Sequence, residues 1–214
     1  MVQKLTKFVS FEEFIQFYAE TGSLYELHNG EIVEMNPPVG DHEFVIGFLV
    51  RKISGELDRL NLSYLIPKTT FIKAAKSESA YLSDILLLNP ANLPNEPLWK
   101  KESTVTQAAS VPLVIEIVSS NWQSDYTHKT NDYESMGIPE YWIVDYGAFG
   151  GKRFIGNPKQ PTISIYSLVD DEYIVNQFRC DDLIISPLFP ELKLTLSQIL
   201  QNIYSLFRSD EVQS

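Results

Sequence analysis

The sequence predicts an α/β (α+β) fold with a mixed central β-sheet flanked by helices. Three segments predict this class. Residues 111–118, VPLVIEIV, form an apolar and β-branched run that is typical of a central strand covered on both faces. Residues 24–35 contain two strand-like runs joined by Asn29-Gly30, which indicates a hairpin. Residues 41–60 carry apolar side chains at helical spacing.

Length and composition indicate one soluble domain. The chain of 214 residues is long enough to bury a sizeable core, and its 44% apolar and 21% charged content is that of a globular protein. We expect a single domain over residues 1–214, with its core at about 10–203 and flexible termini. Because no apolar run approaches the roughly 20 residues of a membrane span and Cys180 is the only cysteine, we expect a cytoplasmic protein without membrane contact.

Two helices are expected in the N-terminal part of the chain. The first runs from Ser10 to Glu20, where Ser10 and Glu13 have the spacing of a capping box. The second runs to about Leu60, and Asp41 is its expected N-cap. Together with the hairpin between them, these helices give the fold an N-terminal helix and β-hairpin.

The hairpin register follows from the turn. A two-residue turn at Asn29-Gly30 pairs His28 with Glu31 and Glu26 with Val33. Since side chains alternate along a strand, Glu26, His28 and Glu31 are expected on one side of the ribbon. A plain solvated face is the alternative for these acids.

Two strands and a long loop are expected next. Residues 64–73 form a strand that Pro67 interrupts, so we expect it at a sheet edge or bulge. Residues 81–88 form a second strand. Residues 89–110 are expected to be a long loop, either a functional lid or disordered.

The second half of the chain continues the alternation of helices and strands. The strand over 111–118 comes first. The remaining elements are a helix over 124–136 ended by Gly137 and Pro139, a strand over 141–145, a hairpin of 162–168 and 172–178 around Asp170-Asp171, and a helix from its cap Thr195 to Phe207.

Two carboxylates lie inside apolar strands. Asp84 stands in YLSDILLL and Glu116 in VPLVIEIV. An ionised carboxylate in a buried strand is costly unless it is paired, hydrogen-bonded or bound to a metal. We expect both acids, with the backbone carbonyl of Ile117, to bind Mg²⁺ or Mn²⁺ beside a phosphate group. The alternatives are a structural ion pair at Glu116 and a solvent-facing Asp84.

A lysine on the following helix completes the candidate site. Asp125, Lys129 and Tyr133 recur every four residues and therefore share one helix face. Packing of this helix on the sheet would bring Lys129 towards Glu116. Desolvation near a metal would lower the pKa of Lys129, which could then act as a base or contact the phosphate. A solvated Lys129 is the alternative, and Tyr133 is expected mainly to pack.

Several motifs together resemble a known family. The chain contains E-I-V-S, then D-x-x-x-K-x-x-x-Y, then GIPEYWIVD, in that order. With YELHNGEIVEMNPP and SPLFPELKLTLSQIL, these motifs resemble the "putative restriction endonuclease" family that is abundant in photosynthetic bacteria. That family was formerly catalogued as a domain of unknown function and belongs to the PD-(D/E)XK nuclease superfamily. The resemblance covers about residues 10–203 and implies a restriction-endonuclease-like core.

The resemblance also implies residue roles. It places Asp84 and Glu116 at the metal-binding acids of a Mg²⁺-dependent or Mn²⁺-dependent endonuclease that cleaves DNA. Two positions depart from the superfamily pattern: Ser83 replaces a proline, and Val118 stands where the superfamily has its lysine. Lys129 from the next helix is expected to replace that lysine. The resemblance further suggests a catalytic or cleft position for Glu31 and a cleft-lining position for His42, with Glu26 and Tyr133 as further candidate lining residues.

The net charge of −11 opposes this function. Proteins that hold DNA by its phosphates usually present a basic face. One rival is a catalytically inactive nuclease-fold protein that binds nucleic acid or protein, and another is an enzyme for RNA or a different phosphodiester. If the partner is duplex DNA, its two-fold symmetry is compatible with a homodimer.

Overall fold

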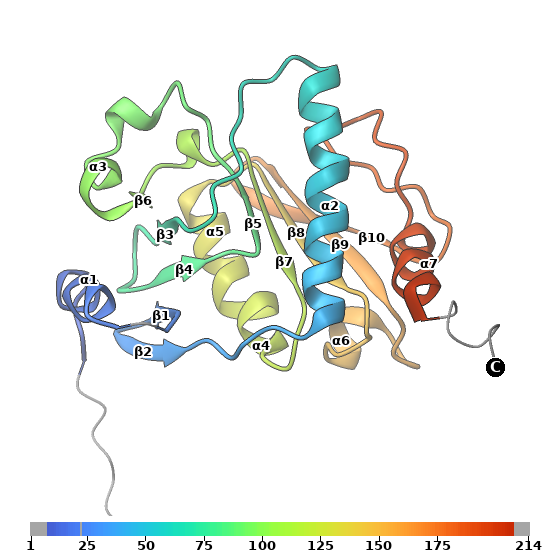
Figure 1. Cartoon of the computed structure of the whole chain (residues 1–214), viewed down its shortest axis with the longest axis horizontal. Helices are drawn as coiled ribbons and strands as arrows, with labels where there is room; N and C mark the ends of the chain where they lie inside the picture. Colours follow the sequence, from blue (N-terminus) through green and yellow to red (C-terminus); the bar gives the residue numbers. More distant parts are fainter. Residues whose placement is uncertain (1–7, 22, 208–214) are drawn as a thin grey trace, which may run out of the picture.

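The computed structural model describes residues 8–21 and 23–207, with side chains as far as Ile203. Two mixed five-stranded sheets lie side by side, with helices packed on their faces (Figure 1). The predicted mixture of helices and strands is therefore confirmed, although the strands are divided between two sheets. The flexibility expected of the termini concerns the ends of the chain, which lie outside the described residues.

The first sheet has the order β2-β1-β4-β3-β6. Only the pair β3 and β6 is parallel; the other neighbours are antiparallel. Its strands are β1 (Tyr25–His28), β2 (Glu31–Glu34), β3 (Phe71–Lys73), β4 (Ala80–Leu82) and β6 (Thr104–Val105).

The second sheet has the order β10-β9-β8-β7-β5. Here β7 and β8 are parallel, and the other neighbours are antiparallel. The apolar run predicted as a central strand forms β7, which is buried at every position. The strands are β5 (Ile85–Leu87), β7 (Leu113–Ile117), β8 (Glu140–Asp145), β9 (Thr162–Val169) and β10 (Glu172–Phe178).

Both predicted hairpins are confirmed. In β1–β2, His28 pairs with Glu31 and Glu26 with Val33. The Asn29-Gly30 turn has φ angles of 49° and 80°, the positive values that this tight turn requires. The hairpin β9–β10 turns through Asp170-Asp171, where both φ angles are also positive.

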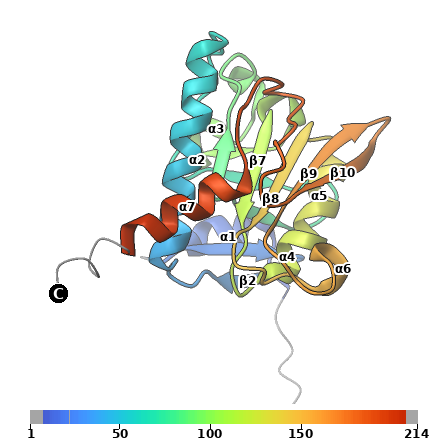
Figure 2. The same cartoon turned by 90° about the vertical axis from the view of Figure 1, so that its right-hand side faces the viewer.

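Helices cover both faces of the second sheet (Figure 2). On one face, α2 (Gly40–Arg59) and α7 (Leu196–Phe207) share an apolar core with β5, β7, β8 and β9. On the other face lies a continuous helical segment made of α4 (Trp122–Ser124), η3 (Asp125–Lys129) and α5 (Thr130–Met136). As predicted, this segment ends at Gly137, whose φ is 82°. A short helix, α6 (Lys152–Ile155), packs on the same side.

The structure confirms two of the three predicted helix caps. Helix α1 (Phe11–Ala19) packs on the first sheet, and its capping box between Ser10 and Glu13 is present. The Thr195 hydroxyl accepts the Gln198 N–H at the start of α7. Asp41 is not the cap of α2, so that prediction is wrong. The cap position is Val39 and the helix starts at Gly40, two residues earlier than predicted, which leaves Asp41 in the first turn, where its charge still complements the helix dipole.

Two strand predictions need correction. Within residues 64–73 only β3 forms a strand, while Leu65 makes a single bridge with Leu88. Residues 81–88 do not form one strand. The chain breaks at Ser83-Asp84, and the two halves, β4 and β5, enter different sheets because each finds its own partner strands.

The expected loop over residues 89–110 is also structured, so that prediction is wrong. It contains η1 (Leu93–Asn95), α3 (Trp99–Glu102), β6 and η2 (Ala108–Ser110). Glu96 organises it: this buried carboxylate accepts hydrogen bonds from Thr106, Gln107 and Ser110.

Candidate active site

The break between the two sheets brings the two predicted acids together. Strands β5 and β7 are antiparallel, with Ile85 opposite Ile115. Continuing this register by one residue sets Asp84 opposite Glu116, and directly opposed side chains lie on the same face. That face is the one covered by η3 and α5, since Val114 and Val118 pack there.

Asp84 is fixed at the end of β7. Its Oδ2 accepts the backbone N–H of Ile117 at 2.7 Å. The Nε2 of His42 lies 3.5 Å from the same oxygen and 3.0 Å from the Ile117 carbonyl oxygen. Burial lowers the pKa of His42, but its hydrogen bond to the Asp84 carboxylate outweighs this and raises that pKa. The structure thus brings His42 to the acids, while the Asp84 side chain keeps 18% of its surface exposed.

Lys129 lies among three carboxylates. Its Nζ is 3.1 Å from Glu26 Oε1, 3.1 Å from Glu116 Oε1 and 3.6 Å from Asp125 Oδ1. The Lys129 side chain is 5% exposed, so these are buried ion pairs. Lys129 is therefore not a solvated helix residue, and it does approach Glu116 as predicted. Tyr133, four residues further on, donates its hydroxyl to Glu116 Oε1 at 3.3 Å.

The pKa values of this cluster follow from burial and charge. Burial raises the pKa of Glu116 well above its ordinary range, and burial also raises the pKa of Asp125 to about 7. Burial acts in the same direction on Glu26, but the ammonium of Lys129 and the ring of His28 outweigh it and lower the pKa of Glu26.

Lys129 differs from the sequence expectation. Burial lowers its pKa, but the carboxylates of Glu116, Glu26 and Asp125 outweigh burial and raise the pKa well above the ordinary lysine value. The lowered pKa expected from desolvation is therefore not found. With these carboxylates around it, Lys129 is a protonated hydrogen-bond donor.

A π turn shapes the helix that carries Lys129. Residues Asp125–Lys129 form η3, a π-helical segment between α4 and α5. The Asp125 carbonyl accepts hydrogen bonds from the Thr130 hydroxyl at 2.7 Å and from the Tyr141 hydroxyl at 3.0 Å. Such turns often occur at functional sites. No sequence pattern predicted this one.

Glu26 connects the first sheet to the cluster. Besides Lys129, it accepts the Leu82 N–H at 2.9 Å through Oε1, and its Oε2 lies 2.7 Å from His28 Nε2. Sequence reasoning gave Glu26 only a lining role, although strand alternation had placed it on the correct face. Glu31 lies on the same face but is exposed. Among the contacts within the described residues, none joins Glu31 to the acids or to Lys129.

The donors of the site suit a divalent cation. One oxygen of each acid, Asp84 Oδ1 and Glu116 Oε2, accepts no hydrogen bond from any described residue. Three carboxylates surround one lysine and Asp84 lies opposite Glu116, which leaves excess negative charge that a hard cation would offset. The third predicted ligand, the Ile117 carbonyl, is engaged by His42. Between residues 8 and 207, leaving out residue 22, no three His, Cys, Asp or Glu side chains are arranged to hold a metal ion.

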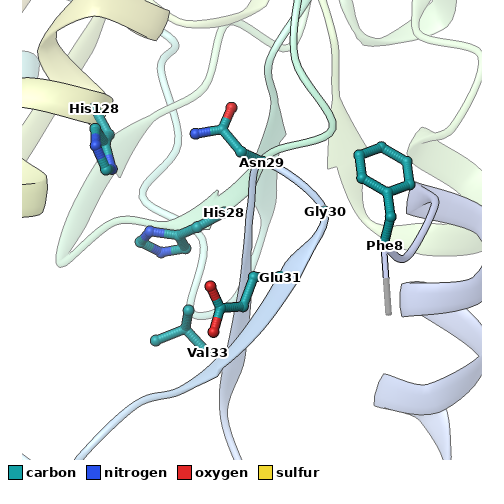
Figure 3. Close-up of a pocket in the computed structure, with 7 residues that line it drawn as sticks. All are labelled: Phe8, His28, Asn29, Gly30, Glu31, Val33 and His128. Carbon is teal, nitrogen blue, oxygen red and sulfur yellow. The ribbon is translucent and has the colours of Figure 1, made fainter. Parts of the chain in front are cut away.

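A pocket of about 370 Å³ opens beside this cluster (Figure 3). The hairpin contributes His28, Asn29, Glu31 and Val33 to its wall, and η3 contributes His128. The pocket adjoins the buried cluster through His28, which contacts Glu26.

Comparisons with known proteins agree with this fold. A crystal structure of a putative nuclease of DUF820 from Anabaena variabilis ATCC 29413 superposes with a TM-score of 0.69. It shares 18% sequence identity, and the match covers 91% of this chain and 99% of that one. No curated protein matches the sequence. No helix within the described residues has the length and apolar character to cross a membrane. The Uma2 family model, described as "Putative restriction endonuclease", matches residues 11–197, so the chain belongs to the Uma2 family.

Proposed function

We propose that this protein is a metal-dependent endonuclease that hydrolyses DNA phosphodiester bonds. One observation supports this proposal most directly: Asp84 lies in register opposite Glu116, and Glu116 Oε1 is 3.1 Å from the buried ammonium of Lys129. Family membership supports a nuclease, and the donor set favours Mg²⁺ or Mn²⁺.

Asp84 and Glu116 would hold the metal, with the Ile117 carbonyl as a further oxygen ligand. When bound, the ion lowers the pKa of a water molecule and offsets charge on the phosphate. His42 holds Asp84 and the Ile117 carbonyl in place through contacts of 3.5 and 3.0 Å from Nε2.

Lys129 would act as a protonated donor. Its raised pKa disfavours a general-base role and favours donation to a phosphate oxygen or to the attacking water. Glu26 and Asp125 keep its ammonium charged and fix its direction towards Glu116. We extend the proposal to a cytoplasmic enzyme that acts on DNA as a homodimer.

An inactive binding protein is the second candidate. The net charge of −11 and the burial of Glu116, which is 3% exposed, favour it. A nuclease must expose its metal ligands to a phosphate, whereas a binding protein can retain the same ion pairs for stability alone.

A plasmid nicking assay with Mg²⁺ and with Mn²⁺ separates these candidates. Asp84→Asn and Lys129→Met are compared with wild type and with Asp58→Asn and Lys101→Met, which replace the same residue types at exposed positions. We expect metal-dependent nicking by wild type and both controls, and a loss of roughly 100-fold or more in both site variants. Equal nicking by all five proteins would locate the activity elsewhere. Folded proteins without any activity would favour the binding protein.

A further inference from the structure

The pocket beside the cluster has its own polar chemistry. Figure 3 shows the side chains of His28, Glu31 and Val33 on one side of the hairpin, facing the helix that carries His128. His128 directly precedes Lys129. His28 Nε2 lies 2.7 Å from Glu26, which in turn lies 3.1 Å from Lys129. A group bound in this pocket would therefore be a direct neighbour of the proposed scissile phosphate.

Three polar side chains of the pocket wall are uncommitted. The side chains of Asn29, Glu31 and His128 have no hydrogen-bond or ion-pair partner in the part of the chain that the structure describes. Asn29 is held instead by its backbone, whose N–H donates to the Ser79 hydroxyl at 3.0 Å. The pocket wall thus offers an amide and a carboxylate on the hairpin and an imidazole on η3.

The same groups exclude a phosphate as the preferred occupant. Neither lysine nor arginine is among the described residues that line the pocket, and the Glu31 carboxylate would repel an anion. A neutral ring with both donors and acceptors fits this mixture. The volume of about 370 Å³ lies at the small end of the range for ligand pockets.

Resting on the proposed nuclease function, we infer that this pocket binds one unpaired nucleobase next to the cleaved phosphodiester bond. Glu31 accepts hydrogen bonds from an exocyclic amino group, as carboxylates do with cytosine, and the Asn29 amide is suited to adenine. The base must be unpaired because a base that is stacked and paired inside a duplex cannot enter a pocket of the protein. The net charge of −11 agrees with this, since firm binding of duplex DNA depends on phosphate contacts.

Base preference is the property that tests the inference. Thymine carries no exocyclic amino group, so oligodeoxythymidylate should bind less well than oligodeoxycytidylate or oligodeoxyadenylate. Fluorescence anisotropy of labelled homopolymers, the matching ribo-oligomers and a DNA duplex measures this with the full chain in EDTA, where metal-dependent cleavage does not interfere. We expect cytosine and adenine oligomers to bind about tenfold more tightly than thymine oligomers and the duplex.

The matched variants are Glu31→Gln and Glu34→Gln. Both residues are exposed on β2, but they point to opposite faces of the strand. Glu31→Gln should abolish the preference, whereas Glu34→Gln should retain it. Removing one negative charge should raise the affinity for every oligomer. The ratio of the affinities for cytosine and thymine oligomers is therefore compared, because this general increase cancels in it.

The outcomes separate this inference from the proposed function. If nicking fails but the base preference exists and depends on Glu31, the nuclease proposal falls and the base pocket stands. If nicking occurs but the duplex and thymine oligomers bind as tightly as cytosine and adenine oligomers, or Glu31→Gln changes nothing, the base pocket is wrong. Absence of binding to every oligomer also overturns it. Tighter binding of the ribo-oligomers would identify RNA as the source of the base.

Discussion

The Asp84 carboxylate accepts the backbone N–H of Ile117 at 2.7 Å, at the point where the two sheets separate. This bond ties Asp84 to the strand that carries Glu116. The positions of the two acids relative to each other are therefore set by backbone pairing rather than by flexible side chains. Such pre-organisation is what a metal site requires.

Metal binding should stabilise the fold. At a hundredfold excess over Kd, a ligand that binds only the folded state adds about 2.7 kcal/mol to the free energy of unfolding. We expect Mn²⁺ to raise the melting temperature of wild type and of Asp58→Asn, and to leave Asp84→Asn unchanged. Differential scanning fluorimetry measures this without reference to activity. An equal shift in Asp84→Asn would place the ion elsewhere.

Replacing Lys129 should destabilise the protein. Lys129→Met leaves Glu26, Glu116 and Asp125 buried without their cation, which should cost about 3–5 kcal/mol in urea denaturation. Lys101→Met, at an exposed position, should stay within about 0.5 kcal/mol of wild type.

A second variant tests the charge explanation of that loss. Adding Glu26→Gln to Lys129→Met removes one of the uncompensated charges, so part of the stability should return. If the double variant is less stable than Lys129→Met, lost packing dominates instead.

Asp125 should make stability fall with rising pH. Its pKa is raised from 3.8 to about 7, so between these values the native state keeps a proton that the unfolded chain has lost. The free energy of unfolding therefore decreases as pH rises through this window. Asp125→Asn removes this contribution, and its stability relative to wild type should improve steadily from the lower to the upper value. Urea unfolding at a series of pH values measures the difference. Parallel curves would show that Asp125 is ionised throughout.

Gly137 should be required for its backbone conformation alone. Its φ is 82°, while a Cβ there would meet neighbours only at ordinary contact distances of 3.8 and 3.9 Å. Gly137→Ala should therefore cost about 1–2 kcal/mol from backbone strain. Gly47 lies within α2 with open space around it, so Gly47→Ala should be neutral or stabilise by up to about 1 kcal/mol. Similar effects of both substitutions in thermal unfolding would contradict this explanation.

Local signals in the sequence predicted much of the fold. Asn29-Gly30 was enough to fix the pairing of β1 and β2, and Ser10 with Glu13 marked the start of α1. In each case the deciding interactions lie within a few residues. The apolar run of β7 was equally informative, because a strand that is buried on both faces consists mainly of apolar residues.

The features that were not predicted depend on distant contacts. Residues 81–88 have the composition of one strand. They are divided because β4 pairs with β1 and β3 in the first sheet, whereas β5 pairs with β7 in the second. The segment before β7 looks like a loop because its organiser, Glu96, acts through hydrogen bonds that the sequence does not reveal. The pairing of Glu26 with Lys129 likewise requires the hairpin to pack against η3.

The π turn at Asp125–Lys129 makes the number of residues in this stretch matter as much as their identity. A π turn closes its hydrogen bond over five residues where an α-helix uses four, so deleting one residue here would convert the turn into a regular α-helical turn and change the directions of the side chains and carbonyls within it. The carbonyl that now receives two hydroxyl groups would lose its place, and the ammonium could no longer reach both sheets at once. A homologue that has one residue fewer between the positions of Trp122 and Tyr133 must supply this positive charge from another part of its chain.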